Sequence, residues 1–452
     1  MRRAAARGGA RTRRTRAARA ARAARTVVLV LLCLLLASGP TGCARRSDGP
    51  SHTLTVLGPW TGREAESFRR LLDRFEQEQQ GHQGQERVRV DYQGTTATRE
   101  VLLSSVLAGD PPDIAVLPVL GDLADYAQRG QLRRLDDDIL PDDDAYEGPW
   151  LSQPAGMSER RRYWLPVKID LKSIVWHERG SDPHAVAGDV DRWCIGMGAD
   201  ATSGWPGSDW IEDILLQQSG ADAYNRWATG NMKWTDDPVV DAWRTWGAFM
   251  SGDGRGEAAR AALVTDHRGP EGGTGLLFDP GRPCDLEHQG SFARSLYGHD
   301  APRATFVPSP QVLPGADRTS PDREVSGDFA AMFRMSAQGR ALMRFLASEE
   351  AQRAWATSVD PPSFSAHRGV TQEAYPPGDG VSRRIVRELQ QAERLCLDAS
   401  DVMPPTIRRL FHEKVLEFLA DPGQNPRGLL AQIERVRNRL PDDTLWLRQV
   451  CR

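Results

Sequence analysis

Apolar and polar positions in the first third of the chain alternate between a strand-like and a helix-like period. Residues 53–57 form a β-branched run that predicts a buried strand, and in the helix that follows Thr61 and Glu64 form a capping box. The apolar face of this helix is made by Ala65, Phe68, Leu72 and Phe75. The alternation continues with predicted strands at 88–92 and 114–117 and predicted helices at 99–108 and 120–128. Such a pattern predicts an α/β fold with a parallel sheet covered by helices on both faces, in which ligands bind beyond the carboxyl ends of the strands.

The rest of the chain is more helical and is interrupted by a segment rich in glycine and proline. Residues 169–176 resemble a further strand, and a loop of small and polar residues with two tryptophans leads to a helix at 210–218 that Gly220 should stop. A helix is predicted at 238–250, a Gly/Pro-rich stretch covers 269–284, and residues from 327 onward look helical again. The length allows two domains.

The N-terminus has the pattern of an export signal. Ten arginines precede an apolar run at 27–37, which is too short to span a bilayer as a permanent helix. The sequence SGPTGC follows, in which Gly42 and Cys43 match the cleavage and acylation pair of a bacterial lipoprotein. We therefore expect an exported protein with residues 1–42 removed and a lipid on Cys43, at the outer face of the cell membrane. An ordinary signal peptide cut nearby is the alternative, and the export route, Sec or twin-arginine, stays open.

Charge and cysteine content agree with export. Removing residues 1–42, which carry ten arginines and no acids, takes the formal charge from −3 to −13 and disfavours nucleic acid as a partner. Four cysteines remain besides Cys33 and Cys43, an even set in an oxidising compartment. Of the three pairings we favour Cys194–Cys284 and Cys396–Cys451. No zinc spacing is present, two aspartate triplets at 136–138 and 142–144 lack the pattern of a calcium loop, and no metal or cofactor is predicted.

Motifs of the common hydrolases and nucleotide-binding enzymes are missing. The sequence has no G-x-S-x-G elbow, no H-E-x-x-H, no P-loop and no G-x-G-x-x-G turn. A pair of carboxylates for glycoside hydrolysis could be nominated among 61 acids, but the sequence gives no carboxyl separation. We therefore expect no enzyme and no catalytic residue, with a secreted glycoside hydrolase as the alternative.

Tryptophan is the preferred aromatic residue, with 13 tryptophans against 12 phenylalanines and 7 tyrosines. Indole faces stack on pyranose rings while neighbouring polar groups bind the hydroxyls. Four tryptophans lie in helical patterns that predict core positions: Trp234, Trp243, Trp246 and Trp355. Trp60, Trp205 and Trp210 lie instead at junctions of a loop and a helix, beside polar residues, and are candidates for a ligand platform.

Several stretches, in this order, resemble one known family. They are LGPWTGREAESFRRLLDRFE, AGDPPDIAVLP, YWLPVKIDLKSIVWH, CIGMGADATSGWPGSDWIEDILL, SGDFAAMF and RFLASEEAQRAWA. Together they resemble the extracellular solute-binding proteins of bacterial ABC sugar importers over nearly the whole mature chain. GWPGSDWIEDILL and LDASDVMP are most similar to the α-glucoside-binding members.

This resemblance implies two α/β lobes joined by crossing strands, with a ligand cleft between them. The first lobe would comprise 53–165 with a return near 300–350, and the second 166–299 with C-terminal helices at 351–452, after a lipid-anchored linker at 43–52. The resemblance implies ligand contacts by Trp60, Thr61, Glu64, Lys168, Asp170, Trp205, Asp209 and Trp210, whereas we interpret Asp113 as a structural cap.

The implied partners are an oligosaccharide, the permease subunits and, through the lipid, the membrane. The protein would act as a monomer, without nucleic acid. A binder of a polyol or a sugar phosphate is the alternative within this class, although a phosphate would call for more arginines on the cleft loops than the sequence places there.

Overall fold

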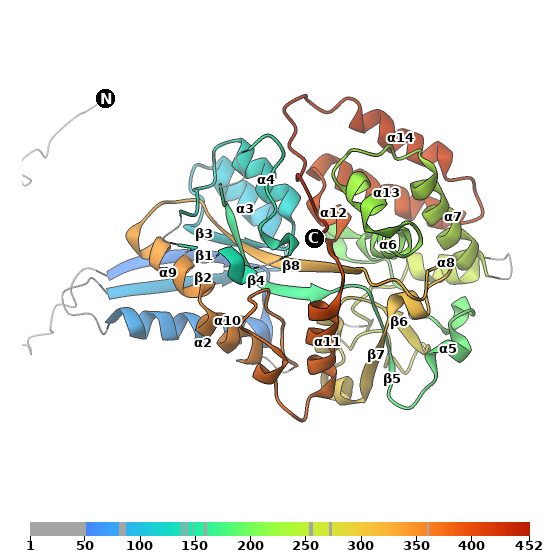
Figure 1. Cartoon of the computed structure of the whole chain (residues 1–452), viewed down its shortest axis with the longest axis horizontal. Helices are drawn as coiled ribbons and strands as arrows, with labels where there is room; N and C mark the ends of the chain where they lie inside the picture. Colours follow the sequence, from blue (N-terminus) through green and yellow to red (C-terminus); the bar gives the residue numbers. More distant parts are fainter. Residues whose placement is uncertain are drawn as a thin grey trace, which may run out of the picture. The chain divides into compact units, whose positions relative to one another are not determined.

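The computed structural model describes residues 51–80, 87–136, 139–140, 143–146, 148–157, 161–252, 256–270, 274–358 and 361–452. From His52 onward these residues form one compact unit (Figure 1). The predicted signal peptide and Cys43 lie outside the described residues, as do the side chains at 137–138 and 142–144 in the two aspartate triplets. Of the helices in the described ranges, none combines the length and the apolar content that crossing a membrane requires.

A six-stranded sheet organises the first part of the fold. It contains β1 (Ser51–Gly58), β2 (Arg87–Gly94), β3 (Ile114–Leu117), β4 (Trp164–Leu171), β8 (Arg323–Met332) and β9 (Leu395–Leu397). The order is β2-β1-β3-β8-β4, and β9 pairs with β8. β1 and β3 are parallel, as predicted, but β8 runs antiparallel to both β3 and β4. The expectation of a purely parallel sheet is therefore wrong, because a strand far along the sequence inserts between β3 and β4.

A smaller, antiparallel sheet organises the second part. Its order is β6-β5-β7, with β5 (Ile174–Glu178) between β6 (Leu286–His288) and β7 (Ala304–Pro308). Only Lys172 and Ser173 separate β4 of the larger sheet from β5 of the smaller one. The chain thus passes directly from one sheet to the other at this point.

Helices surround both sheets. Near the larger sheet lie α2 (Gly62–Gln80), α3 (Thr98–Leu107), α4 (Leu120–Gln128), α9 (Ala337–Ala347) and α10 (Glu349–Ser358), and Figure 1 shows α2, α9 and α10 close together. The others are α5 (Pro183–Val186), α6 (Trp205–Ala228), α7 (Asp237–Ser251), α8 (Glu257–Leu263), α11 (Gly380–Gln391), α12 (Ala399–Val402), α13 (Pro405–Ala420) and α14 (Arg427–Arg437). α6 and α7 pack on each other, and α13 contacts α6, α8 and α14.

Two helix predictions need correction. Residues 327–332 belong to strand β8, and the helix predicted from 327 begins only at Ala337, where Ser336 caps it. The apolar run FAAM is buried along its whole length in the sheet, and a short buried run of this kind does not distinguish a strand from a helix. Helix α6 begins at Trp205, so both tryptophans of the predicted loop are helical. The stop predicted at Gly220 is present as a kink: this residue is not helical, with a φ of 76°, and a second helical stretch follows it directly within α6.

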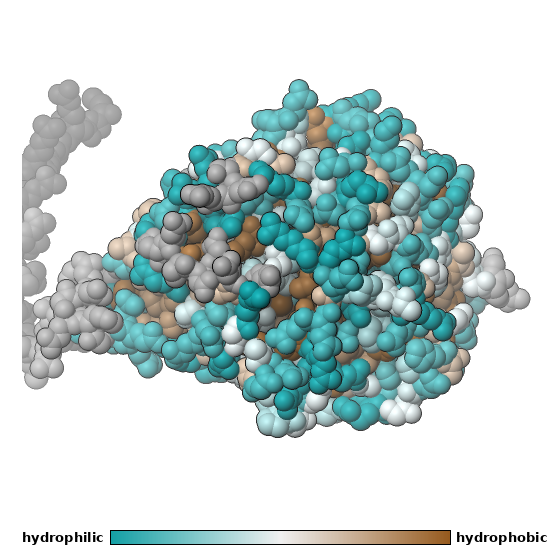
Figure 2. Space-filling model, in the orientation of Figure 1, coloured by the Kyte–Doolittle hydropathy of each residue, from teal (hydrophilic) through white to brown (hydrophobic). Residues whose placement is uncertain are grey.

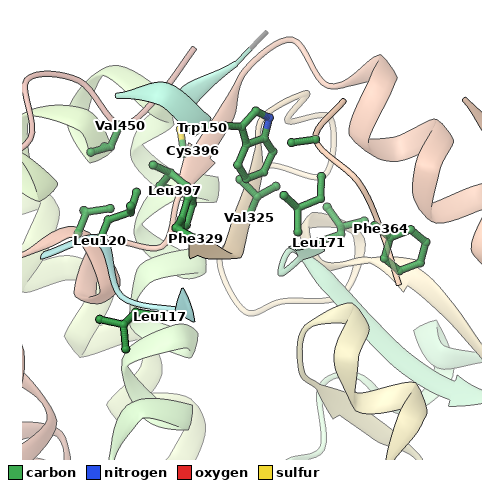
Figure 3. Close-up of a cluster of buried hydrophobic side chains, with 14 of the residues drawn as sticks. Leu117, Leu120, Trp150, Leu171, Val325, Phe329, Phe364, Cys396, Leu397 and Val450 are labelled. Atoms are coloured by element: carbon green, nitrogen blue, oxygen red, sulfur yellow. The ribbon is translucent and has the colours of Figure 1, made fainter. Parts of the chain in front are cut away.

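The core is continuous across the strands that the chain uses to pass between the sheets. Figure 3 shows Val325 and Phe329 of β8 clustered with Leu171 of β4 and Leu397 of β9. The four tryptophans predicted to be core, Trp234, Trp243, Trp246 and Trp355, are at most 1% exposed. The face drawn in Figure 2 is mainly hydrophilic, with smaller hydrophobic areas between.

The described residues contain two disulfides, Cys194–Cys284 and Cys396–Cys451, which are the pairs favoured from the sequence. The first joins the segment before α6 to Cys284, two residues before the start of β6. The second joins β9 to the last residues of the chain.

Candidate functional site

A polar cavity of about 180 Å³ lies where the start of α2, strand β4 and the segment after β6 meet. Its lining consists of Thr61, Arg63, Glu64, Lys168, Asp170, Ser291, Phe292, Ser295, Pro361, Pro362 and Ser363. Four of these, Thr61, Glu64, Lys168 and Asp170, are among the ligand-binding residues expected from the sequence. The structure thus brings half of the predicted set together in one cavity.

Strand geometry brings Lys168 and Asp170 to the same side of β4. Side chains alternate along a strand, so residues two apart share a face. Lys168 Nζ donates to Glu64 Oε1 at 2.8 Å and lies 3.8 Å from Asp170 Oδ2. Burial alone would lower the pKa of Lys168, but the charges of Glu64, Asp170 and Asp328 together raise it, so the ammonium stays charged. The ammonium offsets part of the negative charge of the two carboxylates and leaves carboxylate oxygen atoms for a ligand.

Asp170 is held in place by a serine from another element. Ser291 Oγ donates to Asp170 Oδ1 at 2.7 Å, and Ser291 Oγ itself accepts a hydrogen bond from the backbone N–H of Leu171 at 3.1 Å. Burial raises the pKa of Asp170, while Lys168 and the Ser291 hydroxyl act in the opposite direction. The carboxylate is therefore oriented before any ligand arrives.

Trp60 lies behind the cavity and is not part of its lining. Its side chain is 3% exposed and packs between Phe68 and Trp355, with ring centroids 4.6 and 4.9 Å away. Trp60 Nε1 donates to Asp328 Oδ2 at 3.0 Å. Asp328 lies opposite Lys168 in the pairing of β4 with β8, and burial raises its pKa to about 7. Trp60 thus holds Asp328, the residue paired with Lys168, and has no exposed face on which a ligand could stack.

Asp209 belongs to a buried cluster around Lys172. Lys172 Nζ forms ion pairs with Asp209 and, at 3.1 Å, with Asp398 Oδ2. Burial raises the pKa of Asp209 and Glu324, and neither carboxylate oxygen of Glu324 has a hydrogen-bond partner in the described part of the chain. Asp209, Glu324 and Asp398 have the spacing of a metal site, but the Lys172 ammonium contacts two of the three. Asp209 is 3% exposed and does not line the cavity.

The two tryptophans of α6 occupy different environments. Trp210 is 2% exposed, and its ring lies 4.9 Å from those of both Trp193 and His288. Trp205 is half-buried, and its ring lies 4.8 Å from His267 and 6.0 Å from Phe292, which lines the cavity. Trp205 is therefore close to the cavity through Phe292, whereas Trp210 is a core residue in this structure.

Sequence reasoning missed a part of the lining. Ser291, Phe292, Ser295 and residues 361–363 line the cavity, and none stands in a motif or an amphipathic pattern that singles it out. Arg63 also lines the cavity and lies between Thr61 and Glu64 of the predicted capping box, but no pattern in the sequence assigned it to the site. Lys172 and Asp398 could have been considered as site residues, because both lie in stretches that resemble the family, KIDLKS and LDASD. Their partnership depends on residues more than 200 positions apart and has no signal along the chain.

The sequence is similar to a family of solute-binding proteins and to individual binding proteins of known name. Residues 60–267 match the family described as bacterial extracellular solute-binding protein. The chain is 29% identical over 417 residues to the alpha-glucosides-binding periplasmic protein AglE of Rhizobium meliloti, covering 85% of this chain and 86% of that protein. It is 27% identical over 405 residues to the osmoprotective compounds-binding protein GgtB of Synechocystis, covering 84% and 91%.

Solved structures share the fold at lower identity. A chitin oligosaccharide binding protein superposes with a TM-score of 0.66 at 17% identity, covering 86% of this chain and 99% of that one. The maltose-bound MalE3 of T. maritima superposes with a TM-score of 0.62 at 14% identity, covering 87% and 100%. At these identities the likeness establishes a common fold, the two-lobed one, and no ligand.

Proposed function

We propose that this chain is an extracellular solute-binding protein of a bacterial ABC sugar importer, and that it captures an oligosaccharide, an α-linked glucoside, and delivers it to a membrane permease. The arrangement of Glu64, Lys168 and Asp170 in one cavity carries this proposal. Together with Arg63, which also lines the cavity, the two acids and Lys168 have no net formal charge, so the cavity favours a neutral ligand with many hydroxyl groups. The likeness to a protein named for binding alpha-glucosides supports the choice of sugar.

The same geometry supports binding without covalent chemistry. Both acids of the cavity are engaged by Lys168, and Asp170 also accepts a hydrogen bond from Ser291. Carboxylates held in this way accept hydrogen bonds from ligand hydroxyls and orient them. We propose that the sugar leaves the protein unchanged, and that Cys43 carries the lipid that keeps the protein at the membrane.

Titration calorimetry with maltose, trehalose and a polyol tests the proposal. We expect the wild-type protein to bind an α-glucoside, and Asp170→Asn to weaken binding by roughly 10- to 150-fold, the range for losing a hydrogen bond to a charged group. Asp113→Asn is the matched control, because Asp113 is also a buried aspartate bonded to a hydroxyl, that of Thr55, but lies away from the cavity. It should lower stability and keep the affinity.

Two results would contradict the proposal. One is the absence of heat with every sugar while the polyol binds, which would favour a non-sugar solute. The other is the appearance of shorter sugars after incubation with maltose or trehalose, because a binding protein returns its ligand intact. The lipid anchor is tested separately, by releasing the protein from membranes with Cys43→Ala.

A further inference from the structure

Lys172 occupies the junction between the two sheets. It is the first residue after β4, is 4% exposed, and its backbone N–H donates to Glu324 O in β8 at 2.8 Å. Its ammonium pairs with Asp209 of α6 and with Asp398, which precedes α12. A buried lysine with two carboxylate partners from separate elements has a fixed ammonium position.

Two aromatic rings also lie near the same ammonium. Lys172 Nζ is 5.1 Å from the centroid of the Trp205 ring and 5.8 Å from that of Phe292. Both distances are within the range in which a cation attracts the face of an aromatic ring. Phe292 lines the cavity, so the cation, the indole and the cavity wall form one continuous arrangement.

Gly290 makes this close packing feasible. A Cβ atom at Gly290 would lie 2.7 Å from the Phe292 ring and 3.1 Å from Cδ of Lys172. Any larger residue would push the phenylalanine and the lysine stem apart. The local backbone is therefore compatible with the arrangement only because position 290 has no side chain.

The charge of Lys172 is secured by its surroundings. Burial would lower the pKa of Lys172, but Asp209, Asp398, Glu324 and Asp401 raise it well above its usual value. The ammonium thus remains a cation, and its attraction for the two rings persists over the whole physiological pH range.

We propose that Lys172 is a positioning residue: held by Asp209 and Asp398, its ammonium fixes the rings of Trp205 and Phe292 as an aromatic wall at the edge of the sugar cavity. Asp209 then acts on the ligand through Lys172 and makes no contact with it. This inference rests on the proposed function. It adds that the Lys172 ammonium sets the positions of the two rings at the edge of the cavity.

A double-mutant cycle on sugar affinity tests the inference. Lys172→Met keeps the stem and removes the charge, and we expect it to weaken binding by about 3- to 30-fold, the equivalent of one cation–π contact. In a Trp205→Ala background the same change should weaken binding less than in the wild type, since only the Phe292 ring remains for Lys172 to position. Lys172→Arg should restore most of the affinity. Equal losses in both backgrounds, or no loss in either, would overturn the inference.

A charge-matched double variant serves as the control for effects on folding. Lys172→Met leaves Asp209 without its cation, so Lys172→Met/Asp209→Asn is measured in parallel, with circular dichroism to count the folded fraction. We expect this double variant to recover stability but not affinity. Recovery of affinity would show that the loss came from unpaired charge and would overturn the inference.

A readout without ligand separates the inference from the proposed function. With 5-fluorotryptophan incorporated, the ¹⁹F resonance that disappears in Trp205→Phe belongs to Trp205. We expect Lys172→Met to shift or broaden this resonance and Lys172→Arg to leave it near its wild-type position. An unmoved resonance refutes the positioning role even if sugar binds, whereas a wild-type protein that binds no sugar but shows the shift refutes the proposed function alone.

Discussion

At the scale of single residues, tryptophans that look equivalent in the sequence have different roles. Trp205 and Trp210 are five positions apart, and both lie at the start of one helix beside polar residues. Trp210 nevertheless packs against Trp193, Phe249 and His288, and only Trp205 keeps a partly exposed ring next to Phe292. The residue type and the neighbouring sequence therefore do not decide whether a tryptophan is buried in the core or lies beside the cavity. The direction in which its side chain points from the helix decides this.

We expect alanine substitutions to separate the two tryptophans. Trp210→Ala should cost about 3–5 kcal/mol of unfolding free energy, because it removes a large buried side chain and leaves a cavity. Trp205→Ala should change stability less and weaken sugar binding by roughly 1–3 kcal/mol. Denaturant unfolding and calorimetry on the folded fraction measure the two effects. Native affinity in Trp205→Ala would remove this residue from the site.

At the scale of elements, the approach of α4 to α12 depends on one glycine. A Cβ atom at Gly121 in α4 would lie 2.0 Å from the carbonyl oxygen of Met403, which follows α12. Beside this contact, Arg408 of α13 binds both carboxylate oxygens of Asp122 at 3.1 Å. The start of α4 is thus joined to the segment from the end of α12 to the start of α13, by a backbone contact and by a buried ion pair. The two segments are nearly 300 residues apart in the sequence.

Gly121→Ala tests this close contact. We expect a loss of about 1–3 kcal/mol, since the backbone must shift to admit the methyl group. Gly188→Ala is the control, because no atom lies within 4 Å of a Cβ at that position. It should be neutral or slightly stabilising. Equal melting temperatures for the two variants would mean that α4 moves away from α12 without cost.

At the scale of the whole molecule, buried carboxyl groups should make stability depend on pH. Burial raises the pKa of Glu287 to about 8 and that of Asp328 to about 7. A carboxyl group whose pKa is raised on folding binds its proton more tightly in the folded state. Its contribution to stability is complete below pH 4 and is lost as the pH rises through 7 to 8.

We therefore expect the melting temperature to fall by on the order of 5 °C between pH 5 and pH 8.5, as linked protonation requires. Glu287→Gln should flatten this dependence, because glutamine has the shape of the neutral acid and does not titrate. A wild-type melting temperature that rises over the same interval would contradict the assignment, and thermal unfolding followed by circular dichroism is the measurement.

Ligand binding should also change the arrangement of the whole molecule. The cavity is lined both by α2, beside the larger sheet, and by residues that follow β6 of the smaller sheet. A ligand that contacts both sides favours a closed state, with β4 and β8 as the connecting strands. X-ray scattering should show a smaller radius of gyration with saturating sugar. An unchanged radius would argue against hinge closure.

The sequence by itself determined the local features of this protein. Periodicity located α2, β3 and the four core tryptophans, and the even cysteine set limited the disulfides to three pairings. The resemblance to the family located Lys168 and Asp170, and their spacing in a strand placed them on one face. These features depend on neighbours within a few positions, where backbone geometry fixes the relation between side chains.

Only the tertiary structure decided which distant residues meet. The insertion of β8 between β3 and β4, the pairing of Lys172 with Asp209 and Asp398, and the burial of Trp210 have no periodic signal. An apolar pattern specifies that a face must be covered, but it does not specify which element covers it. The partner is selected by packing and by charge compensation among segments that become neighbours only after the chain has folded.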